Sequence, residues 1–173
     1  MRVVHLALPL AIAFLASACS ATGTPTLAGS PTLPGSQTTT ALRASGATSL
    51  ASADPLTLVN RARRGAGRSS MRLDPKAQRA AKRHARDMAR AGRMAHVLPG
   101  GPGFAVRMKR AGIDTRVAEN VATGQRDAAG AVQAWMNSRG HRRNMLDRGF
   151  RGVGVASAKG ANGRLYWAMV LVP

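Results

Sequence analysis

The spacing of apolar side chains predicts four helices between residues 54 and 140. An Asp-Pro pair occurs at residues 54–55 and again at 74–75. Each pair joins an N-cap side chain to a proline, which is well tolerated at the first helical position, so both predict helix starts. The first helix ends in the glycine-containing segment RRGAGRSS, and the second covers about residues 75–91. A glycine-rich loop separates it from a short helix at 104–111.

The second and fourth of these helices carry an apolar stripe. In the second, His84 lies on the stripe beside Met88, so we expect it in the core or at its boundary. The fourth helix begins at the N-cap Asp127 and closes at Gly140. Its apolar positions follow the spacing i, i+3, i+4, i+7 and i+8, namely Ala128, Ala131, Val132, Trp135 and Met136.

After residue 146, apolar side chains recur at every second position, the spacing of a β-strand. The segment GVGVAS alternates, ANG predicts a turn, and RLYWAMVLVP is apolar at consecutive positions. This pattern predicts a hairpin that turns at Asn162-Gly163 and whose second strand is buried on both faces. Helices around a small antiparallel sheet, an α+β fold, follow from the pattern.

The chain is strongly basic. It has 26 Lys and Arg against 7 Asp and Glu, a net charge of +19. Such a charge predicts attraction to nucleic acid, or to anionic lipids and wall polymers. Two Trp, one Tyr and three Phe are too few to build platforms on which bases stack. We therefore expect anionic envelope polymers as partners and no nucleic acid.

Residues 1–19 have the features of an export signal. Arg2 precedes an apolar run that is too short to span a membrane and that ends in small residues. The segment Ala16-Ser17-Ala18-Cys19 resembles a bacterial lipobox, in which Cys19 becomes lipidated. The alternative is ordinary cleavage after Ala18. We expect an extracytoplasmic protein anchored in the membrane through Cys19, or a secreted one if cleavage is ordinary.

The composition divides the rest of the chain in two. Residues 20–53 are rich in Ser, Thr, Pro and Gly and predict a disordered linker. Residues 54–173 are expected to fold as one domain. Because Cys19 is the only cysteine, this domain has no disulfide and must be held by its hydrophobic core.

Three ionisable residues are candidates for a site. His96 and His141 follow predicted helix ends, and Glu119, the only glutamate, lies in the apolar stretch VAENVATG. Two imidazoles and a carboxylate suit a divalent transition metal such as Zn²⁺. Because no HExxH-type motif is present, a structural hydrogen-bond network of glutamate and histidine is the alternative. The residues alone therefore establish no cofactor.

Six segments together resemble, in order and spacing, the bacterial branch of the CAP superfamily. This is the SCP-domain family of cysteine-rich secretory proteins, antigen 5 and plant pathogenesis-related proteins. The resemblance covers essentially residues 55–173 and implies a three-layer α-β-α sandwich. The segments are LVNRAR, MRLDPKAQRAAKRHARDMARAGRMAH, AENVATG, AVQAWMNSRGHRRNML, GVGVA and YWAMVLV.

The resemblance also implies a central cleft lined by two histidines and two acidic residues. His96 matches the first histidine, Glu119 the first acidic residue, and His141 the second histidine. The second acidic position falls at Ser138, so this chain keeps three of the four. Asn120, beside Glu119, could form a hydrogen bond in the cleft or bind backbone groups only.

Three functions follow as hypotheses. The first is a binding module for a metal, a lipid or another small ligand, because relatives are associated with such binding. The second is a metal-assisted hydrolase of envelope or peptide material, with water held among His96, Glu119 and His141. The chain has no GxSxG elbow, and a single glutamate cannot readily serve as both ligand and base, so binding is favoured over catalysis. The third is a basic structural protein of the envelope.

Overall fold

The computed structural model describes residues 53–173. The predicted signal at 1–19 with Cys19, and the predicted linker up to residue 52, lie outside the described residues. The described elements are helices α2 (Pro55–Gly65), α3 (Pro75–Ala91), α4 (Phe104–Arg110), α5 (Ala128–Asn137) and α6 (Arg139–Leu146), and strands β1 (Arg72–Leu73), β2 (Ala118–Thr123), β3 (Gly152–Lys159) and β4 (Leu165–Val172).

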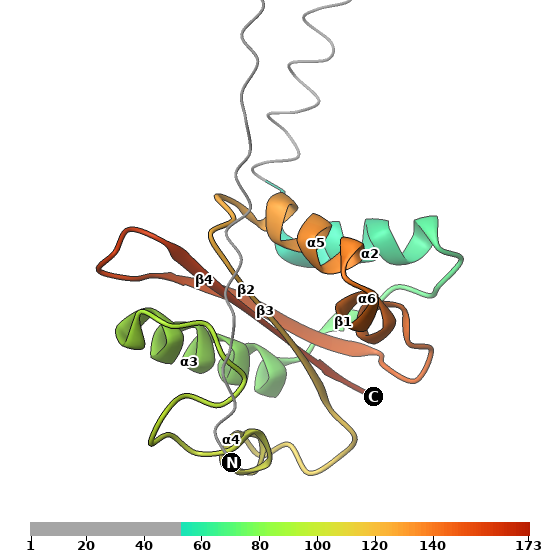
Figure 1. The fold of residues 1–173 in the computed structure, drawn as a ribbon. Helices are drawn as coiled ribbons and strands as arrows, with labels where there is room; N and C mark the ends of the chain where they lie inside the picture. The colour runs from blue at the N-terminus through green and yellow to red at the C-terminus, as the bar shows by residue number, and fades with distance from the viewer. Residues whose placement is uncertain (1–52) are drawn as a thin grey trace, which may run out of the picture. The chain divides into compact units, whose positions relative to one another are not determined.

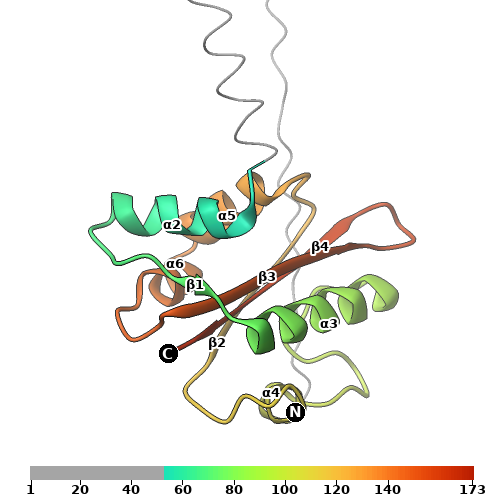
Figure 2. The ribbon, with the colours of Figure 1, turned by 180° about the vertical axis from the view of Figure 1, so that it is seen from behind.

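The elements form three layers. One layer contains α2, α5 and α6, the sheet lies in the middle, and α3 packs on its other face with α4 next to α3 (Figure 1). The view from behind shows the same two helical layers on either side of the strands (Figure 2). The predicted α+β sandwich is confirmed. No helix within residues 53–173 is long and apolar enough to cross a membrane.

Both predicted Asp-Pro helix starts are present. Asp54 accepts a hydrogen bond from the amide of Thr57 at 3.0 Å, and Asp74 accepts one from the amide of Ala77 at 2.8 Å. Each carboxylate thereby satisfies an amide that has no partner inside the first helical turn. Helix α3 ends where Gly92 adopts a left-handed conformation, with φ of 59°.

The sheet is mixed, in contrast to the predicted antiparallel sheet. Its strand order is β1-β3-β4-β2, and β1 runs parallel to β3, whereas the other pairs are antiparallel. With only two residues, β1 is too short to show a strand period in the sequence. Beyond it, the side-chain amide of Gln78 on α3 pairs with the backbone of Val155, at 3.0 Å and 2.9 Å. This side chain therefore completes the edge of β3.

Strand β4 carries the centre of the core. As predicted, it is buried on both faces, and its side chains alternate between the two helical layers. Trp167, Met169 and Leu171 belong to the cluster under α2 and α5. Tyr166, Ala168 and Val170 belong to the cluster under α3.

The β3–β4 hairpin turns over more residues than the predicted Asn-Gly pair. The amide of Gly163 donates to the carbonyl of Gly160 at 2.9 Å, which closes a turn around Ala161 and Asn162. Gly163 then takes a positive φ of 75°. Strand pairing resumes between Lys159 and Leu165.

Helix α6 was not predicted, and it changes the setting of His141. The chain leaves the helical conformation at Ser138, with φ of −93° and ψ of 122°, and Gly140 then falls in the first turn of a new helix. His141 therefore lies inside α6 and does not follow a helix end. The carbonyls at the end of α6 accept hydrogen bonds from two arginines, Arg63 to Met145 and Arg68 to Leu146.

Candidate functional site

Glu119 is buried on the face of strand β2 that is directed towards α3 and α4. On β2, Ala118 and Ala122 pack in the cluster under α5, whereas Val121 packs in the cluster under α3. Because side chains alternate along a strand, Glu119 shares the face of Val121. The residue is 6% exposed. A carboxylate in such a place requires partners.

Arg107 is the main partner of Glu119. From α4, its two terminal nitrogens donate to the two carboxylate oxygens, each at 2.9 Å. The guanidinium also donates to the backbone carbonyl of His96 at 2.8 Å, and it lies 5.4 Å from the ring centre of Phe104. The contact is a buried, bidentate ion pair, the geometry in which arginine binds carboxylates most strongly.

Two histidines complete the surroundings of the carboxylate. The Nδ1 atom of His96, whose side chain is 53% exposed, lies 2.9 Å from Oε1 of Glu119. His84 is fully buried on α3, as its place on the apolar stripe predicted, and its Nε2 lies 3.6 Å from the same oxygen. Nε2 also lies 2.9 Å from the carbonyl of Ala95. Since a carbonyl only accepts, Nε2 carries a proton and Nδ1 of neutral His84 is bare.

The network holds opposite charges in a low-dielectric interior. Burial alone would raise the pKa of Glu119, but hydrogen bonds from His96 and Arg107 outweigh it and hold the pKa below its ordinary value. Burial lowers the pKa of His84, and this effect exceeds the opposing pull of the Glu119 carboxylate. The site therefore pairs an ionised carboxylate with an arginine and keeps the nearby imidazole of His84 neutral.

We expect the free energy of unfolding to fall as the pH drops below about 6.5, the ordinary pKa of histidine. His84 and His141 both have lowered pKa values in the folded protein, so the unfolded chain binds protons first and is favoured. Glu119, with its lowered pKa, adds a second loss only below about 4.3. Melting temperatures between about pH 8 and about pH 5 measure the first step. A variant with His84→Gln and His141→Gln that keeps the same slope would contradict this assignment.

The other predicted cleft residues approach from α6 and β2. Asn120 is fully buried; its amide donates to the backbone carbonyl of His141 at 3.1 Å and accepts from Asn144 at 2.9 Å. It thereby ties β2 to α6. Burial lowers the pKa of His141, and the electrostatic interaction with the imidazole of His96 adds to this effect, so the two side chains share one electrostatic environment. Ser138 lies at the junction of α5 and α6, where its side chain forms no helix-capping hydrogen bond.

These residues do not fit a divalent cation. Both oxygens of Glu119 are bound by Arg107, whose positive charge would repel a metal ion at the same carboxylate. Within residues 53–173, no three side chains of His, Cys, Asp or Glu are placed to hold a metal. The set of His96, Glu119 and His141 proposed from the sequence is therefore not assembled as a metal centre. The contacts of Glu119 match the alternative, a structural network.

Comparison with known proteins decides the family. A model of the cysteine-rich secretory protein family, CAP, matches residues 56–171. The chain belongs to the CAP family.

Three proteins similar to this CAP domain come from bacteria. The uncharacterized protein YkwD of Bacillus subtilis is 34% identical over 99 residues, which cover 57% of this chain and 38% of that protein. An extracellular protein with an SCP domain from Bacillus anthracis has 25% identity and a TM-score of 0.60, covering 68% of this chain and 38% of that one. This chain thus spans about two fifths of either relative. An outer surface protein of Borrelia burgdorferi shares the fold at 18% identity and a TM-score of 0.59, covering 67% of this chain and 86% of that one.

The sequence did not identify Arg107 as a site residue of this CAP domain. It placed His84 in the core or at its boundary, but it did not place His84 beside Glu119. A signal for Arg107 was present, because Phe104, Arg107, Met108 and Ala111 follow the spacing i, i+3, i+4 and i+7 of a buried helix face. A charged residue on such a face needs a buried partner of opposite charge. Glu119 is the only carboxylate in an apolar segment of this chain.

Two pockets of the CAP domain share His84 and Arg107 in their walls. One lies between α3 and α4 and has a volume of about 370 Å³. The other, of about 460 Å³, is bounded by α3 and the loop at residues 98–102, and it contains an acidic residue, Asp87. The pocket between α3 and α4 has no acidic residue in its lining.

Proposed function

We propose that the chain is an exported binding module that acts at the bacterial envelope and does not catalyse hydrolysis. The ion pair between Glu119 and Arg107 is the observation that carries this proposal. A hydrolase built on Glu119 would need a carboxylate free to accept a proton or to hold a metal. Here both oxygens accept hydrogen bonds from one arginine, and the lowered pKa of Glu119 makes it a weak base.

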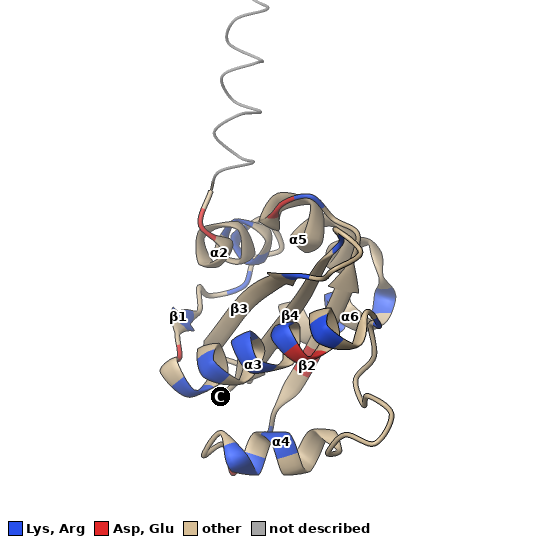
Figure 3. Cartoon of the chain, turned by 90° about the vertical axis from the view of Figure 1, so that its left-hand side faces the viewer, with Lys and Arg blue, Asp and Glu red and all other residues tan. Residues whose placement is uncertain are grey.

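The basic surface supports binding to anionic lipids and wall polymers. Lys and Arg, blue in Figure 3, recur along α3 and α4, whereas Asp and Glu, red, are few. Such a surface attracts polyanions through a field that salt screens. A location at the envelope is supported by the export signal predicted from the sequence and by the similarity to an extracellular protein of Bacillus anthracis. A lipid on Cys19 would add a second, salt-resistant attachment.

The two attachments can be separated by cell fractionation of the full chain and its Cys19→Ser variant. We expect the wild-type chain to stay in the membrane fraction after washing at about 1 M salt, because acyl chains are insensitive to ionic strength while surface charges are screened within about 3 Å. The Cys19→Ser variant should stay with the envelope at low salt and be released at high salt. Immunoblots of the fractions give the result.

Each other outcome removes one part of the proposal. If high salt releases the wild-type chain, Cys19 is not an anchor. If the Cys19→Ser variant is soluble at low salt, the basic surface does not bind the envelope. A Ser69→Ala chain is the matched control, because this exposed, uncharged substitution leaves both attachments in place.

A further inference from the structure

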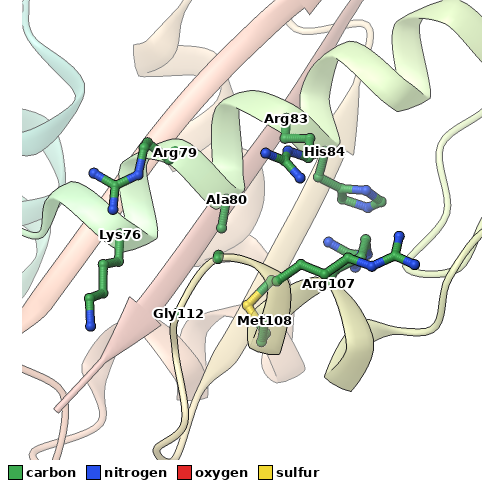
Figure 4. Close-up of a pocket in the computed structure, with 10 residues that line it drawn as sticks. Lys76, Arg79, Ala80, Arg83, His84, Arg107, Met108 and Gly112 are labelled. Carbon is green, nitrogen blue, oxygen red and sulfur yellow. The ribbon is translucent and has the colours of Figure 1, made fainter.

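The pocket between α3 and α4 has the charge of an anion-binding site. Five of its ten lining residues are Lys or Arg, and none is Asp or Glu. Figure 4 shows Lys76, Arg79 and Arg83 on the α3 side and Arg107 on the α4 side. The lining residues are Lys76, Arg79, Ala80, Arg83, His84, Arg107, Met108, Arg110, Ala111 and Gly112.

Only one of the five cations has its charge balanced. Arg107 is paired with Glu119. The side chains of the other four cations take part in no salt bridge or hydrogen bond among residues 53–173. Arg79 and Arg83 lie four residues apart on one helix, a spacing at which like charges repel. A bound anion would relieve this repulsion, and no Asp or Glu lines the pocket.

The inner wall of the pocket adds buried polar atoms without partners. His84 is 1% exposed and its Nδ1 has no hydrogen-bond partner, and the same is true of Nε of Arg107, which is 9% exposed. Bare Nδ1 of neutral His84 accepts a hydrogen bond, whereas Nε of Arg107 donates one. A ligand that carries both hydroxyl groups and anionic oxygens would match this pair. Ala80 and Met108 supply apolar surface beside it.

We infer that this pocket binds the phosphate group of a phosphate ester, with the phosphate among the four unpaired cations. Arginine forks match phosphate oxygens, and several cations suit a group that carries more than one negative charge. The volume of about 370 Å³ lies in the range of small-molecule sites and leaves room for a hydroxyl-bearing alcohol attached to the phosphate. The ester has two possible sources, the headgroup of an anionic phospholipid or a soluble glycerol phosphate unit. This site rests on the proposed envelope function, which it makes more specific.

The test compares two charge-matched double variants of the full chain at fixed ionic strength. Lys76→Gln with Arg110→Gln removes two exposed pocket cations. Arg61→Gln with Arg126→Gln removes two exposed cations that do not line it. The probes are glycerol 3-phosphate in calorimetric titration, and phosphatidylcholine vesicles containing phosphatidylglycerol in co-sedimentation.

We expect the pocket variant to bind at least one probe at least about tenfold more weakly than wild type, since each lost charge-assisted hydrogen bond costs about a factor of ten and two cations are removed. The control should stay within about twofold, and both variants should melt like wild type. Binding of glycerol 3-phosphate identifies a soluble ligand, and binding of vesicles alone identifies a lipid headgroup. Equal weakening in both variants, or no binding of either probe by wild type, would overturn the assignment. In that case, the release of the Cys19→Ser variant from the envelope at high salt would still support the broader envelope function.

Discussion

Replacing Arg107 by methionine should lower the free energy of unfolding by about 3–5 kcal/mol, the cost of removing one partner from a buried ion pair. The side chain of Glu119 is 2% exposed and that of Arg107 is 8% exposed, so water cannot take the place of the lost guanidinium. Methionine keeps the length of the aliphatic part and its contact with the core, so the loss reflects charge and hydrogen bonding. Chemical denaturation followed by circular dichroism measures the change.

The companion variants identify the cause of the loss. Glu119→Gln alone leaves Arg107 as a buried, unpaired cation and should also be destabilising, whereas the double variant removes both charges. We expect the double variant to be more stable than the sum of the single effects predicts, by about 2 kcal/mol, because the two residues are in direct contact. Lys109→Met, on the exposed side of the same helix, should change stability by no more than about 0.5 kcal/mol. Additive single effects would show that the pair is not coupled.

The ion pair also accounts for the only glutamate of the chain. The carboxylate binds Arg107 on α4 and His96 in the loop after α3, and it lies near His84 on α3. It therefore joins three segments of one helical layer to the edge strand β2. Loss of this carboxylate is expected to loosen α4 first, because α4 has only seven residues and little packing of its own.

Local signals predicted the helices well. Asp54 and Asp74 cap their helices as the sequence indicated, because an N-cap depends on residues only two or three positions away. Strand β4 was equally clear, since burial on both faces requires a continuous apolar run. Helix α6 was missed because Gly140 and its many polar residues suggest a loop, whereas its position depends on Arg63 and Arg68, distant in sequence.

The site was less predictable, because it is made by side chains from separate segments. The family resemblance indicated His96, Glu119 and His141, but it could not show that Arg107 binds both oxygens of the carboxylate. This contact decides the chemistry, since it makes Glu119 the partner of a fixed cation. Residue types alone allow either a metal centre or a hydrogen-bond network, and only the positions of the side chains distinguish them.

A second large single-residue effect is expected at Gly154 on β3, where the backbone of α3 lies close to the strand. A Cβ atom at this position would overlap the backbone nitrogen of Gln78 and the backbone carbon of Ala77. Neither atom belongs to a flexible side chain, so the whole helix would have to move. Two hydrogen bonds between the side chain of Gln78 and the backbone of Val155 hold α3 at this distance, and both would be strained.

We therefore expect Gly154→Ala to lower the free energy of unfolding by at least about 3 kcal/mol, at the upper end of the usual cost of overpacking. Gly140→Ala is the matched control: nothing lies within 4 Å of a Cβ built there, and alanine in α6 should stabilise by up to about 1 kcal/mol. Opposite signs in the two denaturation curves would support the contact. If Gly154→Ala unfolds like wild type, α3 is not held against β3 at this point. Because α3 carries His84 and the pocket residues Arg79 and Arg83, a displaced helix should also weaken phosphate ester binding in whatever fraction of the variant remains folded.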